Sequence, residues 1–458
     1  MSDKRQKNQL MLAFAEESRS EAPRDSAEGT ESFAAKREAE SPASSEQLME
    51  EVCGRNNCRQ ALARVKRNKG SAGVDGMTVE QMPAYLKQHW PAIREQLLRG
   101  TYKPQPVKRV EIPKPDGGIR KLGIPTVLDR FIQQAVMQVL QSRWDRTLSD
   151  NSYGFRPGRS AHQAVAKAQQ YIAAGYGWVV DLDLEKFFDR VNHDKLMAQI
   201  AKRVSDQRML KLIWAFLRAG VMEGGLVSPV DEGTPQGGPL SPLLSNIVLD
   251  ELDRELERRG HRFVRYADDS NIYVRSRRAG DRVMTSTSKF ITMKLKLQVN
   301  EEKSAVARPW ERKFLGFSFT WQRDTKRRIA PKAIARFKQR VRELTRRTRG
   351  VSVETMVAQL GRYLTGWRGY FGFCQTPSGL LSLDRWLRRR LRSVVWKQWK
   401  YARVRFAELR QRGVGKDLAA QTAGSAHGPW HLSNSPALSY ALPNAYLASL
   451  GLPRLVAD

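Results

Sequence analysis

Residues 263–275 read FVRYADDSNIYVR, and this stretch decides how the rest of the chain is interpreted. Two short runs rich in Val, Ile, Phe and Tyr flank a polar break that holds Asp268 and Asp269. This pattern predicts a β-hairpin whose turn carries two adjacent carboxylates. Asp is a favoured turn former, so an isolated pair of this kind is more often a simple turn than a functional site. Whether Asp268 and Asp269 form a simple turn or a functional site depends on whether a third carboxylate, a template path and a nucleotide pocket occur elsewhere in the chain.

A second acidic stretch lies upstream, in GWVVDLDLEKFFDRVNHDKL. Residues 178–184 are expected to form a strand that is buried on both faces except at Asp181 and Asp183. A carboxylate in such a strand is costly unless a partner compensates its charge, and a metal ion does so most directly. For Phe187, which follows the strand, we expect ordinary core packing.

The bulk composition restricts the class of protein. The chain has 458 residues, enough for about three domains on a prior of roughly 150 residues each, and it carries 79 Lys and Arg against 47 Asp and Glu, a net charge of +32. So large a basic excess favours a polyanionic partner, and nucleic acid is the most common one. No apolar stretch is long enough to span a membrane. Three scattered cysteines indicate a reducing compartment.

The chain order predicts a disordered tail over residues 1–46, followed by one helix from Gln47 to Gly70 and a second that ends at Gly100. Residues 102–130 predict a hairpin with a Pro-Asp-Gly-Gly turn, in which Lys114 and Arg120 could meet the phosphates of a nucleotide. The same hairpin could equally carry ordinary surface charge.

Two loops, each followed by a helix, are predicted further along the chain. Arg156 and Arg159 stand before a helix that begins at Ala161 with Ser160 as its N-cap, where they could clamp a phosphate backbone or simply belong to a capped loop. The stretch Pro235-Gln236-Gly237-Gly238 precedes a helix that we expect Ser241 to cap. Glycines there let the backbone approach a ligand or template closely.

The region after residue 323 changes character. Its helices are strongly basic, with an apolar face at helical spacing and several tryptophans, as in RDTKRRIAPKAIARFKQRVRELTRRTRG. Basic helices with interleaved aromatic side chains are typical of nucleic-acid-binding surfaces. Between the 263–275 hairpin and this region, we expect a helix that runs into a short strand ending near Lys303, and then half of a further hairpin.

Five blocks in a fixed order resemble the palm of reverse transcriptases: VVDLDLEKFF (179–188), GTPQGGPLSPLLSNIVLDELD (233–253), YADD (266–269), LQVNEEKS (297–304) and FLGFSF (314–319). More narrowly, the chain resembles the proteins encoded by bacterial group II introns. Further upstream and downstream blocks match that family's N-terminal, fingers, maturase and tail regions: KGSAGVDG (69–76), IPKPDGGIRKLGIPTVLDR (112–130), SYGFRPGRSAHQAV (152–165), GWRGYFGF (366–373) and residues 428–455.

The resemblance implies an α+β fold: a right-hand polymerase whose fingers and palm contain an antiparallel sheet flanked by helices, followed by an α-helical thumb or maturase domain. The expected divisions are a disordered tail (1–46), an N-terminal extension with the start of the fingers (47–110), fingers and palm (111–325), the thumb and maturase helices (326–405) and a nucleic-acid-binding tail (406–458).

The resemblance also implies roles for individual residues. The metal ligands and catalytic carboxylates are Asp183, Asp268 and Asp269, and Lys303 is a candidate general acid. Asp183 is preferred to Asp181 because the family's aromatic gate, here Phe188, lies five positions further on. Phe188 would exclude a ribose 2′-hydroxyl. The nucleotide would also contact Lys114, Arg120, Gln236 and Gly237. RNA would contact Arg156, Arg159, Arg336, Arg340, Arg388 and Arg389.

The implied cofactor is a pair of Mg²⁺ ions, which Mn²⁺ could replace. The implied partners are group II intron RNA, a DNA target and primer, and deoxynucleoside triphosphates, and no membrane is expected. The oligomeric state is left open. The expected location is a cytoplasmic ribonucleoprotein associated with the nucleoid. Many relatives end in a DNA endonuclease with paired Cys and His around a metal. After Cys374 this sequence has no further cysteine, and only His427 and His431 lie near each other, so we expect the primer to come from elsewhere, such as a replication fork. Two alternatives stay open: recruitment to host DNA repair or defence, and a maturase that acts mainly as an RNA-binding splicing cofactor.

Overall fold

The computed structural model describes residues 47–113, 118–223, 226–228, 232–234, 237–322, 324–346 and 348–456. These residues separate into two compact units. The first runs to Ala307 and the second begins at Arg308, with the short segment 172–175 grouped with the second. The disordered tail expected over residues 1–46 lies outside the described residues.

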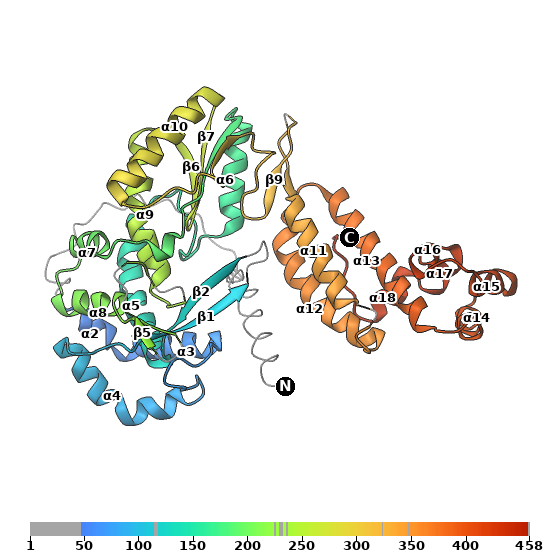
Figure 1. Cartoon of the computed structure of the whole chain (residues 1–458), viewed down its shortest axis with the longest axis horizontal. Coiled ribbons are helices and arrows are strands. Elements are labelled where there is room, and N and C mark those ends of the chain that lie inside the picture. Colours follow the sequence, from blue (N-terminus) through green and yellow to red (C-terminus); the bar gives the residue numbers. More distant parts are fainter. Residues whose placement is uncertain are drawn as a thin grey trace, which may run out of the picture. The chain divides into compact units, whose positions relative to one another are not determined.

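The first unit is built from helices and two four-stranded sheets (Figure 1). Its helices are α2 (Leu48–Val52), α3 (Arg55–Asn68), α4 (Met82–Arg99), α5 (Val127–Trp144), α6 (Ala161–Ala173), α7 (His193–Ala201), α8 (Gln207–Leu217), α9 (Ser241–Arg258) and α10 (Arg277–Phe290), which continues as a π-helical turn (Ile291–Leu295). Short 3₁₀ turns cover Asp145–Thr147 and Phe187–Asp189.

One sheet has the strand order β2-β1-β4-β5 and contains the predicted basic hairpin. Its strands are β1 (Val107–Pro113), β2 (Ile119–Ile124), β4 (Val221–Glu223) and β5 (Leu226–Ser228). β1 and β2 pair antiparallel, which confirms the hairpin, whereas β1 and β4 pair parallel.

The other sheet has the order β6-β7-β3-β8, and each of its neighbouring pairs is antiparallel. Its strands are β3 (Trp178–Leu182), β6 (Arg262–Tyr266), β7 (Asp269–Val274) and β8 (Ala305–Ala307). Helix α10 packs along β3, β7 and β8 (Figure 1). Strand β3 is paired at both edges, and its side chains Val179, Val180 and Leu182 are buried.

The second unit contains a small hairpin and a set of helices (Figure 1). Its hairpin joins β9 (Phe317–Phe319) to β10 (Arg327–Ile329), as expected from the sequence. Its helices are α11 (Pro331–Leu344), α12 (Val353–Phe371), α13 (Pro377–Gln398), α14 (Ala402–Gln411), α15 (Lys416–Ala423), α16 (Pro429–Leu432), α17 (Pro436–Ala441) and α18 (Asn444–Ser449). Phe337 and Val341 of α11 are buried in its core, which confirms the predicted apolar face.

Three local predictions are wrong. The helix expected from Gln47 to Gly70 is two helices, because the chain turns at Cys53 and Gly54 between α2 and α3. Ser241 does not cap α9: it is the first helical residue, and the N-cap position is Leu240. The strand expected to end near Lys303 begins after it, at Ala305.

Ser160 behaves as predicted. Its hydroxyl oxygen accepts from the Gln163 backbone N–H, and the Gln163 side chain accepts from the Ser160 N–H, a reciprocal capping box at the start of α6. In the described part of the chain, no helix is both long and apolar enough to cross a membrane.

Candidate active site

The pairing of β3 with β7 places two of the predicted acids side by side. The last pair of the ladder joins Leu182 to Ser270, so Asp183 and Asp269 lie one position beyond it at the same end of the sheet. Directly opposed residues of an antiparallel pair have Cβ atoms about 4.5–5.5 Å apart. Asp183 and Asp269 therefore occupy neighbouring backbone positions on paired strands, although they are far apart in the sequence.

Asp268 lies in the turn of the β6–β7 hairpin, which Tyr266 and Asp269 close as a pair. The other turn residue, Ala267, has φ +57° and is buried. A positive φ at the first central position of a two-residue turn is normally supplied by Gly, and an L-residue there costs roughly 1–2 kcal/mol. Contacts with the rest of the fold must hold this turn in place.

Gly154 is one such contact. A Cβ atom on Gly154 would lie 2.3 Å from the Ala267 backbone nitrogen, so no larger residue fits without moving the turn. Burial raises the pKa of the neighbouring Tyr266 phenol. The hairpin that carries two of the acids is therefore packed backbone against backbone.

Lys303 reaches Asp183 from the segment that precedes β8. Its Nζ atom is 3.6 Å from Oδ2 of Asp183, and both side chains are partly exposed. Backbone bonds fix this approach: the Asp183 carbonyl accepts from the Asn300 N–H, and the Asp183 N–H donates to the Ser304 hydroxyl. The structure thus brings the candidate general acid to the acid at the end of β3.

Phe188 lies in the 3₁₀ turn just after β3. Its neighbour Phe187 is buried in the core, as predicted, and the two rings meet edge to face at 5.2 Å, while Phe188 itself is only partly buried. The Thr234 N–H donates to the Phe188 carbonyl, and a Cβ on Gly233 would overlap that carbonyl at 2.8 Å. The chain that leads into the Pro-Gln-Gly-Gly loop is therefore anchored to the Phe188 turn.

Gly237 has φ +132°, and a Cβ there would lie 2.7 Å from the Gly123 carbonyl oxygen at the end of β2. Glycine is required on both counts, as expected for a loop that approaches another backbone. Gln236 and Lys114 lie outside the described residues. Arg120 pairs with Ile112 in the β1–β2 ladder, and only its backbone is described.

Two of the arginines assigned to RNA are buried. Arg156 bonds Asp145 and the carbonyls of Ser149 and Ser152, and its side chain is 4% exposed. Arg388 is 3% exposed at the side chain and pairs with Asp384 one turn earlier in α13. Both guanidinium groups hold the fold together, and this burial corrects the expectation that they face RNA.

The other four arginines differ in exposure. Arg159 pairs with Asp150, and Arg389 stacks on the Trp430 ring at 4.3 Å. Arg336 and Arg340 lie on the exposed side of α11, where Arg340 pairs with Glu343. Of these four arginines, the two on α11 are the most exposed.

The donor set suits a hard divalent cation. Carboxylate oxygens are the ligands that Mg²⁺ prefers, and it commonly uses one or two of them with substrate phosphates and waters. In the described part of the chain, no three His, Cys, Asp or Glu side chains gather into a ready-made metal cage. The carboxylates at the end of β3 and in the hairpin fit an ion that the substrate helps to bind.

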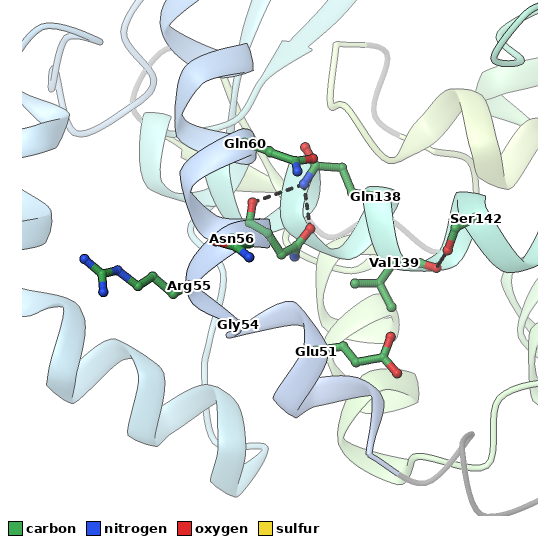
Figure 2. Close-up of a pocket in the computed structure, with 9 residues that line it drawn as sticks. Glu51, Gly54, Arg55, Asn56, Gln60, Gln138, Val139 and Ser142 are labelled. Carbon is green, nitrogen blue, oxygen red and sulfur yellow. Dashed lines mark hydrogen bonds between the residues drawn. The ribbon is translucent and has the colours of Figure 1, made fainter.

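A polar hollow elsewhere in the first unit is not part of this site. It lies beside α3 and α5, and residues from both helices line it (Figure 2). The Gln138 amide there donates to the Asn57 backbone carbonyl and to its side-chain oxygen. None of the predicted site residues lines this hollow.

Two family matches cover most of the described chain. Residues 112–319 match the reverse transcriptase (RNA-dependent DNA polymerase) family, and residues 334–413 match the group II intron maturase-specific domain. The chain thus combines a reverse transcriptase domain with a group II intron maturase-specific domain. The predicted α+β fold, with an antiparallel palm sheet and a helical C-terminal region, is confirmed.

The chain is similar to Protein YkfC of Escherichia coli (strain K12), with 41% identity over 41% of this chain and 50% of the relative. It is also similar to the group II intron-encoded protein LtrA of Lactococcus lactis subsp. cremoris, with 39% identity over 42% of this chain and 32% of the relative. The chain thus matches half or less of the length of these relatives.

A solved chain from a partial Cas6-RT-Cas1–Cas2 complex is similar over 54% of this chain and 42% of the solved chain, with 24% identity and a TM-score of 0.36. That likeness is too low to support an argument about function.

Sequence reasoning missed the residues that hold the hairpin turn. Arg265, the last residue but one of β6, and Asp253, in α9, are both fully buried and form an ion pair. The signal was present, because a charged residue inside an apolar strand requires a buried partner.

Proposed function

We propose that this protein is an RNA-directed DNA polymerase that copies group II intron RNA into cDNA and assists the splicing and mobility of that intron. The observation that carries the proposal is the β3–β7 register, which sets Asp183 opposite Asp269 beside the Asp268 turn, within a reverse transcriptase domain. The maturase match to residues 334–413 supports the RNA-folding role.

In this proposal Asp183, Asp268 and Asp269 hold two Mg²⁺ ions, which when bound would activate the primer 3′-hydroxyl and stabilise the leaving pyrophosphate. Lys303, next to Asp183, delivers a proton to the pyrophosphate. Phe188 closes the pocket against a 2′-hydroxyl, and the glycine loop at Gly237 gives room for the templating base.

The proposed partners are intron RNA, a DNA target with its primer, and deoxynucleoside triphosphates. Exposed arginines of α11, Arg336 and Arg340, contribute to RNA binding in the second unit. We place the protein in a ribonucleoprotein at the nucleoid.

The proposal is tested by extension of a DNA primer on an RNA template with the Asp268→Ala variant. We expect cDNA synthesis to be abolished while intron RNA binding and splicing assistance persist, because the second unit is unchanged. Asp281→Ala is the matched control, since Asp281 is an exposed acid of α10 in the same unit. Primer extension by Asp268→Ala at the wild-type rate would refute the assignment.

The same experiment separates this proposal from a protein that acts only as a splicing cofactor. If the wild-type protein assists splicing but extends no primer under any divalent metal, the polymerase proposal fails and the maturase role stands alone.

A further inference from the structure

The Arg265 guanidinium is completely buried, and each of its N–H donors has a partner. Nε and Nη2 bond the two carboxylate oxygens of Asp253 at 2.8 and 2.5 Å. Nη2 also donates to the Ser152 hydroxyl at 2.8 Å. Nη1 donates to the Asn246 side-chain oxygen at 3.0 Å and to the Ala267 carbonyl at 2.9 Å. The five N–H groups of a guanidinium are thereby all used.

The bond to Ala267 matters most for the site. A peptide group is planar, so the carbonyl of Ala267 and the N–H of Asp268 move as one body. Holding that carbonyl fixes the direction in which the chain enters Asp268. Ala267 is also the turn residue with the positive φ, so this bond stabilises a backbone conformation that alanine does not favour.

The same group connects the turn to the rest of the fold. Asp253 and Asn246 both come from α9, the helix that follows the glycine loop. The Asn246 amide donates to the Gly154 carbonyl at 2.9 Å, and Gly154 packs against the nitrogen of Ala267. The Arg265 backbone itself bonds Asn151 and Tyr153. One side chain thus ties α9, the 151–154 segment and the hairpin turn together.

Stability alone does not account for such a group. Replacing a buried ion pair with apolar residues of similar size is often neutral or stabilising, because both charges lose their hydration on burial. A planar guanidinium with fixed donors is, in contrast, well suited to hold several acceptors at set positions.

We propose that Arg265 is a positioning residue for nucleotidyl transfer: its guanidinium holds the Ala267 carbonyl and thereby aims Asp268 and Asp269. This inference rests on the proposed polymerase function. Arg265 itself contacts no substrate. Its role is to keep the turn in one orientation before the nucleotide and its metal ions bind.

The test compares Arg265→Lys with wild type in the full-length protein. Lys keeps the positive charge beside Asp253 but cannot span Asp253 and Ala267 at once. We expect kcat for primer extension to fall by about 100-fold, the loss typical of a reacting group that is misplaced by about 1 Å. The KM for the primer–template should stay unchanged, since the RNA-binding surface is not altered.

A second readout is independent of activity. Hydrogen exchange of the peptide that covers residues 262–274 should become faster in Arg265→Lys, while exchange in α8 and α5 stays at the wild-type rate. Ile213→Val in α8 is the stability control, because Ile213 is fully buried and belongs to neither the site nor this network. We expect that control to lower the thermal midpoint without changing kcat or the exchange of the hairpin.

The proposal is overturned if folded Arg265→Lys keeps wild-type kcat, or if its kcat falls while exchange of the hairpin is unchanged. If Arg265→Lys does not fold, Asn246→Ala serves instead, because it removes one acceptor of Nη1 and the bond to Gly154 while keeping the Arg265–Asp253 pair. If the wild-type protein has no polymerase activity, the proposed function fails. Whether Arg265 holds the hairpin turn is then still decided by comparing hydrogen exchange of residues 262–274 in Arg265→Lys and wild type.

Discussion

The Nζ atom of Lys303 lies 3.6 Å from Oδ2 of Asp183, and the Asp183 backbone bonds Asn300 and Ser304 on either side of that lysine. If Lys303 donates a proton to pyrophosphate, Lys303→Ala should lower kcat by about 10²- to 10⁴-fold, the usual contribution of general acid catalysis. Pre-steady-state primer extension measures this rate without interference from product release.

Lys303→Arg separates proton donation from ion pairing. Arginine keeps a positive charge beside Asp183, but it does not give up its proton at physiological pH. Proton donation therefore predicts that Arg rescues little of the rate. Full rescue by Arg would show that Lys303 only balances the charge of Asp183.

Phe188 provides a test of sugar selection. Phe188→Ala should admit ribonucleotides, with selection against the 2′-hydroxyl reduced by about 10- to 200-fold, the range expected when shape alone discriminates in a pocket. Single-nucleotide incorporation with matched deoxy- and ribonucleoside triphosphates gives the ratio. Phe187→Leu is the control, because Phe187 is buried behind the gate and its change should affect stability but not sugar choice.

Gly154 and Ala267 give a prediction about backbone packing. Gly154→Ala places a Cβ where the backbone of the hairpin already lies, so the turn must shift and primer extension should fall sharply. Gly379→Ala in α13 is the comparison, since nothing lies within 4 Å of a Cβ there. That change should be neutral or raise stability by about 0.5–1 kcal/mol, as for Gly to Ala in a helix. Equal activity of the two variants would show that the close approach is irrelevant to the site.

The hairpin and its strands could be predicted from the sequence because two short runs rich in Val, Ile, Phe and Tyr flank a polar break of turn-forming residues. That the strand of Asp183 lies beside this hairpin followed from grouping the three acids as metal ligands, but the register that sets Asp183 opposite Asp269 could not be read from any local pattern. Arg265 was missed although a charge inside an apolar strand indicates a buried partner, and that partner, Asp253, lies 12 residues upstream on a helix where no local pattern identifies it.

Exposure was the other quantity that the sequence did not reveal. Arg156 stands in a turn that could clamp a phosphate and Arg388 in a basic helix that predicts a nucleic-acid surface, yet each is paired with a carboxylate of the fold, Asp145 and Asp384. A count of basic residues describes the net charge of a region, and the packing decides which of those side chains reach solvent.

Arg208 links stability to pH. It bonds both Glu50 and the N-cap Asp206, at distances of 2.7–3.0 Å. Hydrogen bonding to Arg208 lowers the pKa of Glu50. At Asp206 burial raises the pKa, and bonds from Arg208 and the Met49 N–H outweigh it, so that pKa is lowered too.

Groups with a lowered folded pKa stabilise the protein above their unfolded pKa of about 4, and this contribution is lost as the pH falls through the folded pKa. Arg208→Met should therefore lower the free energy of unfolding by about 1.5–3 kcal/mol at pH 7, the scale of hydrogen bonds to charged groups, and the difference should shrink below pH 4. Urea unfolding across this range measures it. Arg99→Met is the control: it breaks an exposed helical pair with Glu95 and should change the free energy of unfolding little at any pH. If the difference in unfolding free energy between Arg208→Met and wild type is the same at every pH, the proposed link between Arg208 and pH is wrong.

The exposed arginines of α11 predict how RNA binding depends on salt. Each phosphate contact that is lost should reduce the slope of log K against log salt by about 0.7–0.9. The double variant Arg336→Gln, Arg340→Gln should therefore bind intron RNA more weakly and with a shallower slope. Arg388→Met should lower stability and leave the slope of the folded protein unchanged, because Arg388 is buried against Asp384.

Glu343→Gln adds a test in the opposite direction. Glu343 pairs with Arg340 at 2.8 Å, and its removal leaves that guanidinium available to a phosphate and also removes a repulsive charge from the surface. Binding should become tighter, with a slope that is the same or steeper. If Glu343→Gln and the double arginine variant both leave binding unchanged, α11 does not contact the RNA, and the basic helices further along the chain must supply the electrostatic attraction.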